Sequence, residues 1–223
     1  MGGVPSVAEQ QNPRTVHDFK PPENWRLEHV EAVHRHFING NFDFGLDKST
    51  WERFLKEAIP TAEDAAVTLY RKFDTNDARM VNVVEVMSGL CIMCQATVID
   101  KARFLFDMHD FNGQGTLSYD ELVVMLYLTA TATVLLSGKG VVPEETAMES
   151  IADEAFVTAD VDISDRIPKD GFCRWLLDYL NITEETPSVG LREFLKRFKS
   201  LKAAKVEKTA GQLALERELE RAT

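Results

Sequence analysis

Polar stretches rich in Asp, Asn and Gly interrupt the apolar pattern of this chain at a nearly regular spacing. They begin at residues 39, 74, 110 and 160, and apolar residues recur at helical spacing on both sides of each stretch. The repeat predicts four helix–loop–helix units. Because one such unit cannot bury its apolar face alone, we expect an all-α fold in which the units form two pairs.

The stretch 110–121 carries oxygen-bearing residues at alternate positions. Gly115 stands at position 6, where a sharp turn favours a residue without a Cβ atom, and Leu117 stands at position 8. Because Ca²⁺ is a hard cation that takes six to eight oxygen ligands, this is the pattern of an EF-hand calcium loop. We expect one Ca²⁺ here, held by Asp110, Asn112, Gln114, Thr116 (through its carbonyl), Ser118 and Glu121.

The affinity expected of this loop is moderate. Gln114 is neutral at position 5, so only Asp110 and Glu121 bring carboxylates. Since fewer charged ligands bind Ca²⁺ less tightly, a Kd on the order of 10⁻⁶ to 10⁻⁴ M is expected.

The stretch 74–85 is a degenerate second copy of the loop. Ala78 offers no oxygen at position 5, and Arg79 replaces the turn glycine. The residues that could still form a weak site are Asp74, Asn76 and Glu85. We expect this loop to fold without metal.

Two further copies have lost more of the pattern. The stretch 39–50 lacks an acid at both ends, and the stretch 160–171 ends on Gly171 in place of the clamping acid. The possible weak ligands in the last copy are Asp160, Asp162 and Ser164.

The position-8 residues predict how the loops pair. Leu46 is expected opposite Val81, and Leu117 opposite Ile167, through a short β contact. Asp47 is expected to cap the helix that follows, with Trp51 facing inward. The organisation predicted is an extended tail over 1–23, loop pairs over 24–95 and 96–185, and a basic helix over 186–223.

Composition narrows the class of protein. The formal net charge of −11 argues against a nucleic-acid partner. Three cysteines, Cys91, Cys94 and Cys173, indicate reduced thiols in the cytoplasm. The CxxC spacing of the first two allows a redox pair, but their place near a helix end favours structural thiols. The histidines show no zinc spacing with the cysteines, and no catalytic set or phosphate loop is found, so we do not expect an enzyme.

Membrane contact is expected only through acylation. The uncharged run 122–138 is shorter than the roughly 20 residues that span a bilayer, so a buried helix is the better interpretation. Gly2 fits the short MGxxx[ST] pattern for myristoylation, with Ser6 at its last position.

The last part of the chain is basic, in contrast to the acidic body. Residues 191–223 carry 9 Lys/Arg against 5 Asp/Glu, and an amphipathic helix is predicted there. Three interpretations stay open: the helix fills the protein's own groove, docks on an acidic partner such as tubulin or another subunit, or lies on anionic membrane or in solvent. The partner-binding candidates are Phe194, Phe198, Leu201, Lys196 and Arg197.

Several runs resemble the neuronal-calcium-sensor and calcineurin-B-like branch of EF-hand proteins. They are 45–48, 81–85, 88–90 and 106–121, within a resemblance that covers about residues 25–180. The nearest likeness is to calcium sensors of ciliary outer dynein arms. It implies a protein that binds helical, dynein-associated or microtubule-associated partners in the axoneme of cilia or flagella. Because loops 74–85 and 160–171 depart from the pattern, only loop 110–121 carries over as a site.

Two functions are therefore expected. In the first, Ca²⁺ at 110–121 moves the following helix and opens a groove lined by Phe104, Met108, Val124 and Met125, which then binds a protein target. The alternative is a structural adaptor subunit of a larger axonemal or cytoskeletal assembly, which binds equally with and without Ca²⁺.

Overall fold

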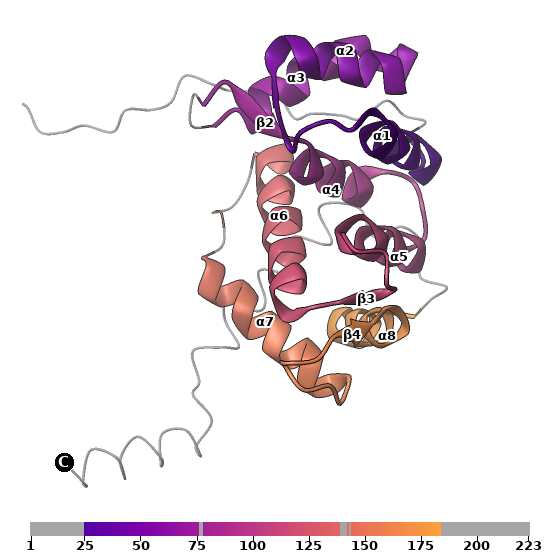
Figure 1. Cartoon of the computed structure of the whole chain (residues 1–223), viewed down its shortest axis with the longest axis vertical. Helices are drawn as coiled ribbons and strands as arrows, with labels where there is room; N and C mark the ends of the chain where they lie inside the picture. The colour runs from indigo at the N-terminus through magenta and orange to yellow at the C-terminus, as the bar shows by residue number, and fades with distance from the viewer. Residues whose placement is uncertain (1–24, 76–77, 139–141, 143, 184–223) are drawn as a thin grey trace, which may run out of the picture.

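The computed structural model describes residues 25–75, 78–138, 142 and 144–183, and this part of the chain is helical with two short two-stranded sheets (Figure 1). The all-α fold predicted from the repeat is confirmed. The helices are α1 (Leu27–Gly40), α2 (Lys48–Ala58), α3 (Glu63–Phe73), α4 (Val83–Met93), α5 (Val98–His109), α6 (Tyr119–Ser137), α7 (Glu145–Thr158) and α8 (Lys169–Leu180), with a 3₁₀ turn at Pro60–Ala62.

The loops pair through the predicted position-8 residues. Strands β1 (Gly45–Asp47) and β2 (Met80–Asn82) are antiparallel, with Leu46 opposite Val81. Strands β3 (Thr116–Leu117) and β4 (Ile167–Pro168) pair likewise, with Leu117 opposite Ile167. All four side chains are buried, so each contact joins the two loops through both backbone pairing and the hydrophobic core.

The residue at position 9 of a loop starts the helix that follows. Asp47 accepts a hydrogen bond from the Thr50 amide at 3.0 Å, as predicted. Asn82 caps α4, and Ser118 caps α6. Proline occupies this position in the fourth loop, and its side chain makes no cap hydrogen bond. These caps fix the direction in which three of the helices leave their loops.

The loop 39–50 begins later than predicted. Helix α1 continues to Gly40, so Asn39 lies in the helix and not in a ligand position. Asn41 ends the helix in the left-handed conformation, with φ 51°. Asparagine tolerates that conformation, and no acid at position 1 holds the loop in the EF-hand form.

One hydrophobic cluster runs through both loop pairs, from Trp25 to Trp175. Helices α4 and α6 form the main contact between the pairs, and Figure 1 shows α6 lying between α4 and α7. Lys72 and Lys101 are buried and donate to the carbonyls of Leu136 and Ile92, at the ends of α6 and α4. These contacts satisfy carbonyls that a helix end leaves without partners.

By length and composition alone, α6 is the one helix of the described residues that could cross a membrane. More than half of its most apolar window is buried, and the core helix of a folded protein meets the same criteria. This agrees with the buried helix predicted from the uncharged run.

The cysteines are buried and free. Cys91 lies in the last turns of α4, and Cys94 is the residue that ends this helix. The Cys94 thiol donates to the Cys91 carbonyl at 3.1 Å. Their setting favours the structural interpretation of the CxxC spacing.

Gly89 marks the closest approach of α4 and α6. A Cβ atom added there would stand 2.6 Å from Leu136 Cδ1 and 3.0 Å from Ala132 Cβ. We predict that Gly89→Val lowers the free energy of unfolding by about 2 kcal/mol because it overpacks this contact. Urea unfolding checks the value. The double variant Gly89→Val/Leu136→Ala should regain part of the lost unfolding free energy. If the two substitutions lower that free energy additively, the predicted clash of residue 89 with Leu136 is contradicted.

Candidate calcium site

The loop 110–121 curls around the carboxylate of Asp110. This residue ends α5, and its two oxygens accept hydrogen bonds from the amides of Gln114 at 3.2 Å and Gly115 at 2.6 Å. Asn112 Oδ1 accepts from the Gln114 amide at 3.0 Å. Gly113 and Gly115 hold φ of 65° and 74°, a region that glycine enters without strain. The side-chain oxygens of Asp110 and Asn112 are therefore both turned toward the loop backbone at Gln114 and Gly115.

The donor set suits a hard cation. Carboxylate, amide, hydroxyl and carbonyl oxygens are the groups that Ca²⁺ takes. Among the described residues no three His, Cys, Asp or Glu side chains gather as a metal group, which agrees with a loop that has only two acids. A Ca²⁺ ion would be held by Asp110, Asn112, Gln114, the Thr116 carbonyl, Ser118 and Glu121, the residues predicted from the sequence.

Glu121 already has two partners. Its Oε2 accepts from the Ser118 amide at 2.8 Å, which forms a capping box at the start of α6. The same oxygen accepts from Arg166 Nη2 at 2.5 Å. This ion pair was not predicted from the sequence, because the pattern within one loop does not show which side chains cross to the paired loop.

Loop 74–85 keeps part of the EF-hand loop geometry, although Arg79 replaces the turn glycine. Asp74 Oδ1 accepts from the amide of Arg79 at 3.1 Å, much as Asp110 accepts from Gly115. Arg79 has φ 59°, a left-handed conformation that is unfavourable for a residue with a Cβ atom. Asn76 lies outside the described residues. Arg79 thus holds the left-handed conformation that Gly115 holds in loop 110–121.

Glu85, at position 12 of that loop, lies largely out of solvent. Burial raises its pKa to about 7. A carboxyl group whose pKa is raised in this way resists ionisation, which weakens it as a cation ligand.

Loop 160–171 differs at its first ligand position. Asp160 is left-handed with φ 55°, whereas Asp110 and Asp74 have φ of −78° and −79°. The Asp162 carboxylate accepts from the Ser164 amide and hydroxyl at 2.9 and 2.7 Å. The contact of Asp162 with the Ser164 amide matches that of Asn112 with the Gln114 amide, whereas the backbone at position 1 differs from that of the third loop.

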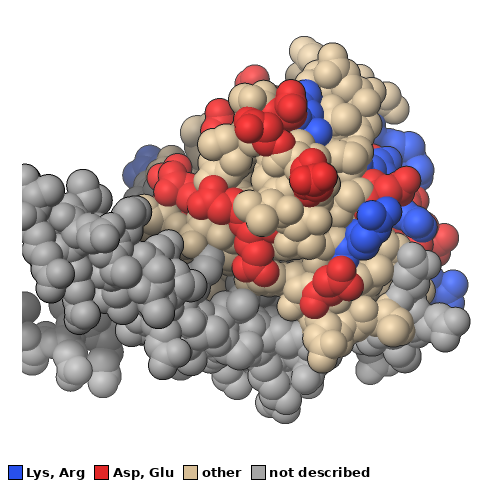
Figure 2. Space-filling model, turned by 90° about the horizontal axis from the view of Figure 1, so that it is seen from below, with Lys and Arg blue, Asp and Glu red and all other residues tan. Residues whose placement is uncertain are grey.

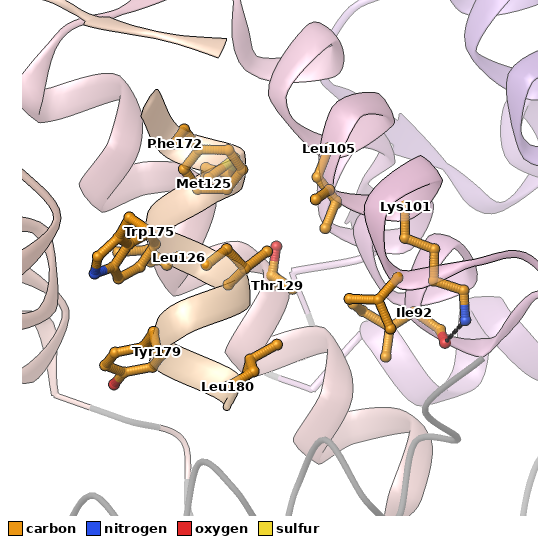
Figure 3. Close-up of a pocket in the computed structure, with 13 residues that line it drawn as sticks. Ile92, Lys101, Leu105, Met125, Leu126, Thr129, Phe172, Trp175, Tyr179 and Leu180 are labelled. Carbon is orange, nitrogen blue, oxygen red and sulfur yellow. Dashed lines mark hydrogen bonds between the residues drawn. The ribbon is translucent and has the colours of Figure 1, made fainter. Parts of the chain in front are cut away.

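A small apolar cavity of about 50 Å³ lies in the second loop pair (Figure 3). Figure 3 shows Trp175, Tyr179 and Leu180 on α8 at one wall and Leu105, Lys101 and Ile92 on the opposite side. Within the described chain, Trp175 Nε1, Tyr179 OH and Thr129 Oγ1 are buried without a hydrogen-bond partner. The cavity is thus lined by apolar atoms, and Figure 3 shows Trp175 Nε1 and Tyr179 OH pointing away from Leu105 and Lys101.

The groove that Ca²⁺ is predicted to open stays a prediction, and its four residues lie apart in the structure. Met125 lines the cavity, but Phe104, Met108 and Val124 do not. Phe104 packs edge-on against His34 of α1, Met108 is buried elsewhere in the core, and Val124 is 43% exposed. The neighbouring first loop pair covers the face of α5 that carries Phe104, and the sequence of the second pair alone does not show this contact.

Paired loops, antiparallel position-8 contacts and flanking helices together define an EF-hand protein. The chain is 28% identical over 83 residues to calaxin of Xenopus laevis and 29% identical over 83 residues to calaxin of Homo sapiens. These matches cover 37% of this chain and 40% and 39% of the two calaxins. It is also 26% identical over 97 residues to calcium-binding protein K of Dictyostelium discoideum, a match that covers 43% of this chain and 48% of that protein.

The chain is thus an EF-hand protein related to calaxin over the matched stretch, which spans less than half the length of each relative. No protein-family model matches it.

The raised pKa of Glu85 predicts a pH dependence of stability. Because the pKa of the folded state is above that of the unfolded chain, folding favours the protonated form, and stability falls as pH rises through 7. We expect Glu85→Gln to remove a loss on the order of 1–3 kcal/mol between pH 5 and pH 8. Urea unfolding with chelator, at several pH values, measures it. Parallel profiles for the two proteins would show that Glu85 ionises normally.

Proposed function

We propose that this chain is a calcium-responsive EF-hand protein that binds one Ca²⁺ in loop 110–121 and a protein partner through its second loop pair. The observation that carries the proposal is the Asp110 carboxylate, which accepts two loop amides beneath two left-handed glycines. Loop 74–85 keeps an amide contact to Asp74 but has Arg79 in place of the turn glycine, and loop 160–171 begins on a left-handed Asp160. A single site follows.

Glu121 connects the candidate calcium site to helix α6. It is the last residue of the loop and belongs to the first turn of α6. A change in the partners of this carboxylate therefore acts directly on the helix that packs against α4 and α7. Met125, Leu126 and Thr129 lie on the same helix and line the apolar cavity, so the site and the cavity share one rigid element.

The partner best suited to this cavity is an amphipathic helix. Apolar side chains of its buried face would enter between α5, α6 and α8, where the cavity is lined by apolar atoms. Figure 2 shows acidic side chains spread over the described part of the face seen from below, and Asp153, Glu154 and Asp170 are among the exposed acids of α7 and α8. This charge favours a basic helix.

The basic segment of the chain itself matches that description. Phe194, Phe198, Leu201, Lys196 and Arg197 lie outside the described residues, so the choice among the three interpretations of this segment stays a prediction. The resemblance to sensors of ciliary dynein arms suggests an axonemal partner, and Gly2, also outside the described residues, remains a candidate for acylation.

A matched pair of variants tests the site. Glu121→Gln and Glu85→Gln make the same change at position 12 of two loops. We predict by calorimetry that wild type binds one Ca²⁺, that Glu121→Gln weakens binding on the order of a hundredfold, and that Glu85→Gln leaves it unchanged. Intact binding in Glu121→Gln would refute the assignment.

A calcium-independent adaptor is the second candidate function. It is favoured by the hydrogen bonds of Glu121, which the Ser118 amide and Arg166 already satisfy. In this case the paired loops serve only to hold the helices in place.

The two functions predict different partner binding. The full chain, immobilised and exposed to ciliary extract with Ca²⁺ or with chelator, should retain a partner at least about tenfold better with Ca²⁺ if the first function holds, a difference of about 1.4 kcal/mol. The Glu121→Gln variant is the control and should show no such difference. Equal retention by wild type under both conditions would support the adaptor.

A further inference from the structure

Arg166 crosses from the fourth loop into the third. It stands at position 7 of loop 160–171, directly before β4. Its Nε donates to Thr116 Oγ1 at 2.9 Å, and its Nη2 donates to the Thr116 carbonyl at 2.8 Å and to Glu121 Oε2 at 2.5 Å. One guanidinium therefore contacts three oxygens of the neighbouring loop.

Two of those oxygens are the ones expected to hold the cation. The position-7 carbonyl and the position-12 carboxylate are both EF-hand ligands. A guanidinium is a permanent cation with several N–H donors in one plane, and it suits a carboxylate beside a carbonyl. The ion pair is partly shielded, because the side chains of Arg166 and Glu121 are 30% and 18% exposed.

We propose that Arg166 is an internal competitor for Ca²⁺, which holds Thr116 and Glu121 until the ion displaces it. The inference rests on the proposed function of loop 110–121. The competition is a second reason, besides the neutral Gln114, why the site should bind Ca²⁺ only moderately tightly. It also makes the fourth loop, which has lost its own ligands, a regulator of the third.

The pairing of the two loops does not depend on Arg166. Leu117 and Ile167 keep the strands in register, and the Lys169 amide donates to the Gly115 carbonyl at 3.3 Å. Lys169 also forms an ion pair with Asp107 of α5. The guanidinium can therefore leave its three acceptors while the loops stay joined.

The test compares two charge-matched variants of the full chain. Arg166→Gln removes the guanidinium at the site, and Arg174→Gln removes one from the exposed surface of α8. Calorimetry with Ca²⁺ should give binding about five- to tenfold tighter for Arg166→Gln than for wild type, and no change for Arg174→Gln. Should Arg166→Gln fold poorly, Arg166→Lys keeps the charge without the planar donors and should show part of the gain.

A second measurement follows the guanidinium itself. In ¹⁵N NMR spectra with chelator, the Nε–H signal of Arg166, assigned by its loss in Arg166→Gln, should be separate from those of exposed arginines. Adding Ca²⁺ should move it into their range.

The outcomes distinguish failure of the Arg166 competition from failure of the proposed calcium site. If wild type binds Ca²⁺ but Arg166→Gln binds no more tightly, or the Nε–H signal does not respond, the competition is wrong and the site stands. If wild type shows no Ca²⁺ binding and Arg166→Gln binds Ca²⁺, the competition is supported, and Arg166 blocks the site completely. If neither protein binds Ca²⁺, the proposed site itself fails, and the competition fails with it.

Discussion

The carboxylate of Glu121 contacts the third loop, the start of α6 and the neighbouring fourth loop at the same time. It closes the third loop, caps the start of α6 through the Ser118 amide, and pairs with Arg166 from the fourth loop. Because α6 packs against both α4 and α7, any force on this side chain reaches both loop pairs. A single cation, whether a guanidinium or a metal ion, is therefore placed where it can bias the whole arrangement.

The four loops can differ in their ligands because their folding depends mainly on other residues. A paired loop needs only its buried position-8 residue and its helix faces to fold, so ligands can be lost without loss of structure. Arg79 keeps the left-handed conformation that glycine holds in loop 110–121, whereas Asp160 is left-handed where Asp110 is not. The four-unit frame is kept, and we propose that Ca²⁺ binds only in the loop that keeps its ligands.

Much of this frame was predictable from sequence because it depends on local spacing. The register of Leu46 with Val81 and of Leu117 with Ile167 follows from counting positions, and so does the cap at Asp47. The extension of α1 over Asn39 was missed because loop boundaries depend on which residue tolerates a left-handed turn. The face of α5 covered by His34 was missed because it depends on contacts between the loop pairs.

The contact of Arg166 with Glu121 was likewise not predicted, because it also joins two separate parts of the chain. A cationic residue beside β4, opposite a loop that ends on an acid, was visible in the sequence, but only a comparison across the paired loops would have shown it. The proposed binding of one Ca²⁺ beside Asp110 can be followed by NMR of the Gly115 amide, because that amide donates to Asp110 Oδ2. On titration with Ca²⁺ its signal should shift and saturate at one equivalent, while the amides of Arg79 and Asp165 shift far less. A Gly115 signal that stays in place, or one matched by equal shifts in the other loops, would contradict the account.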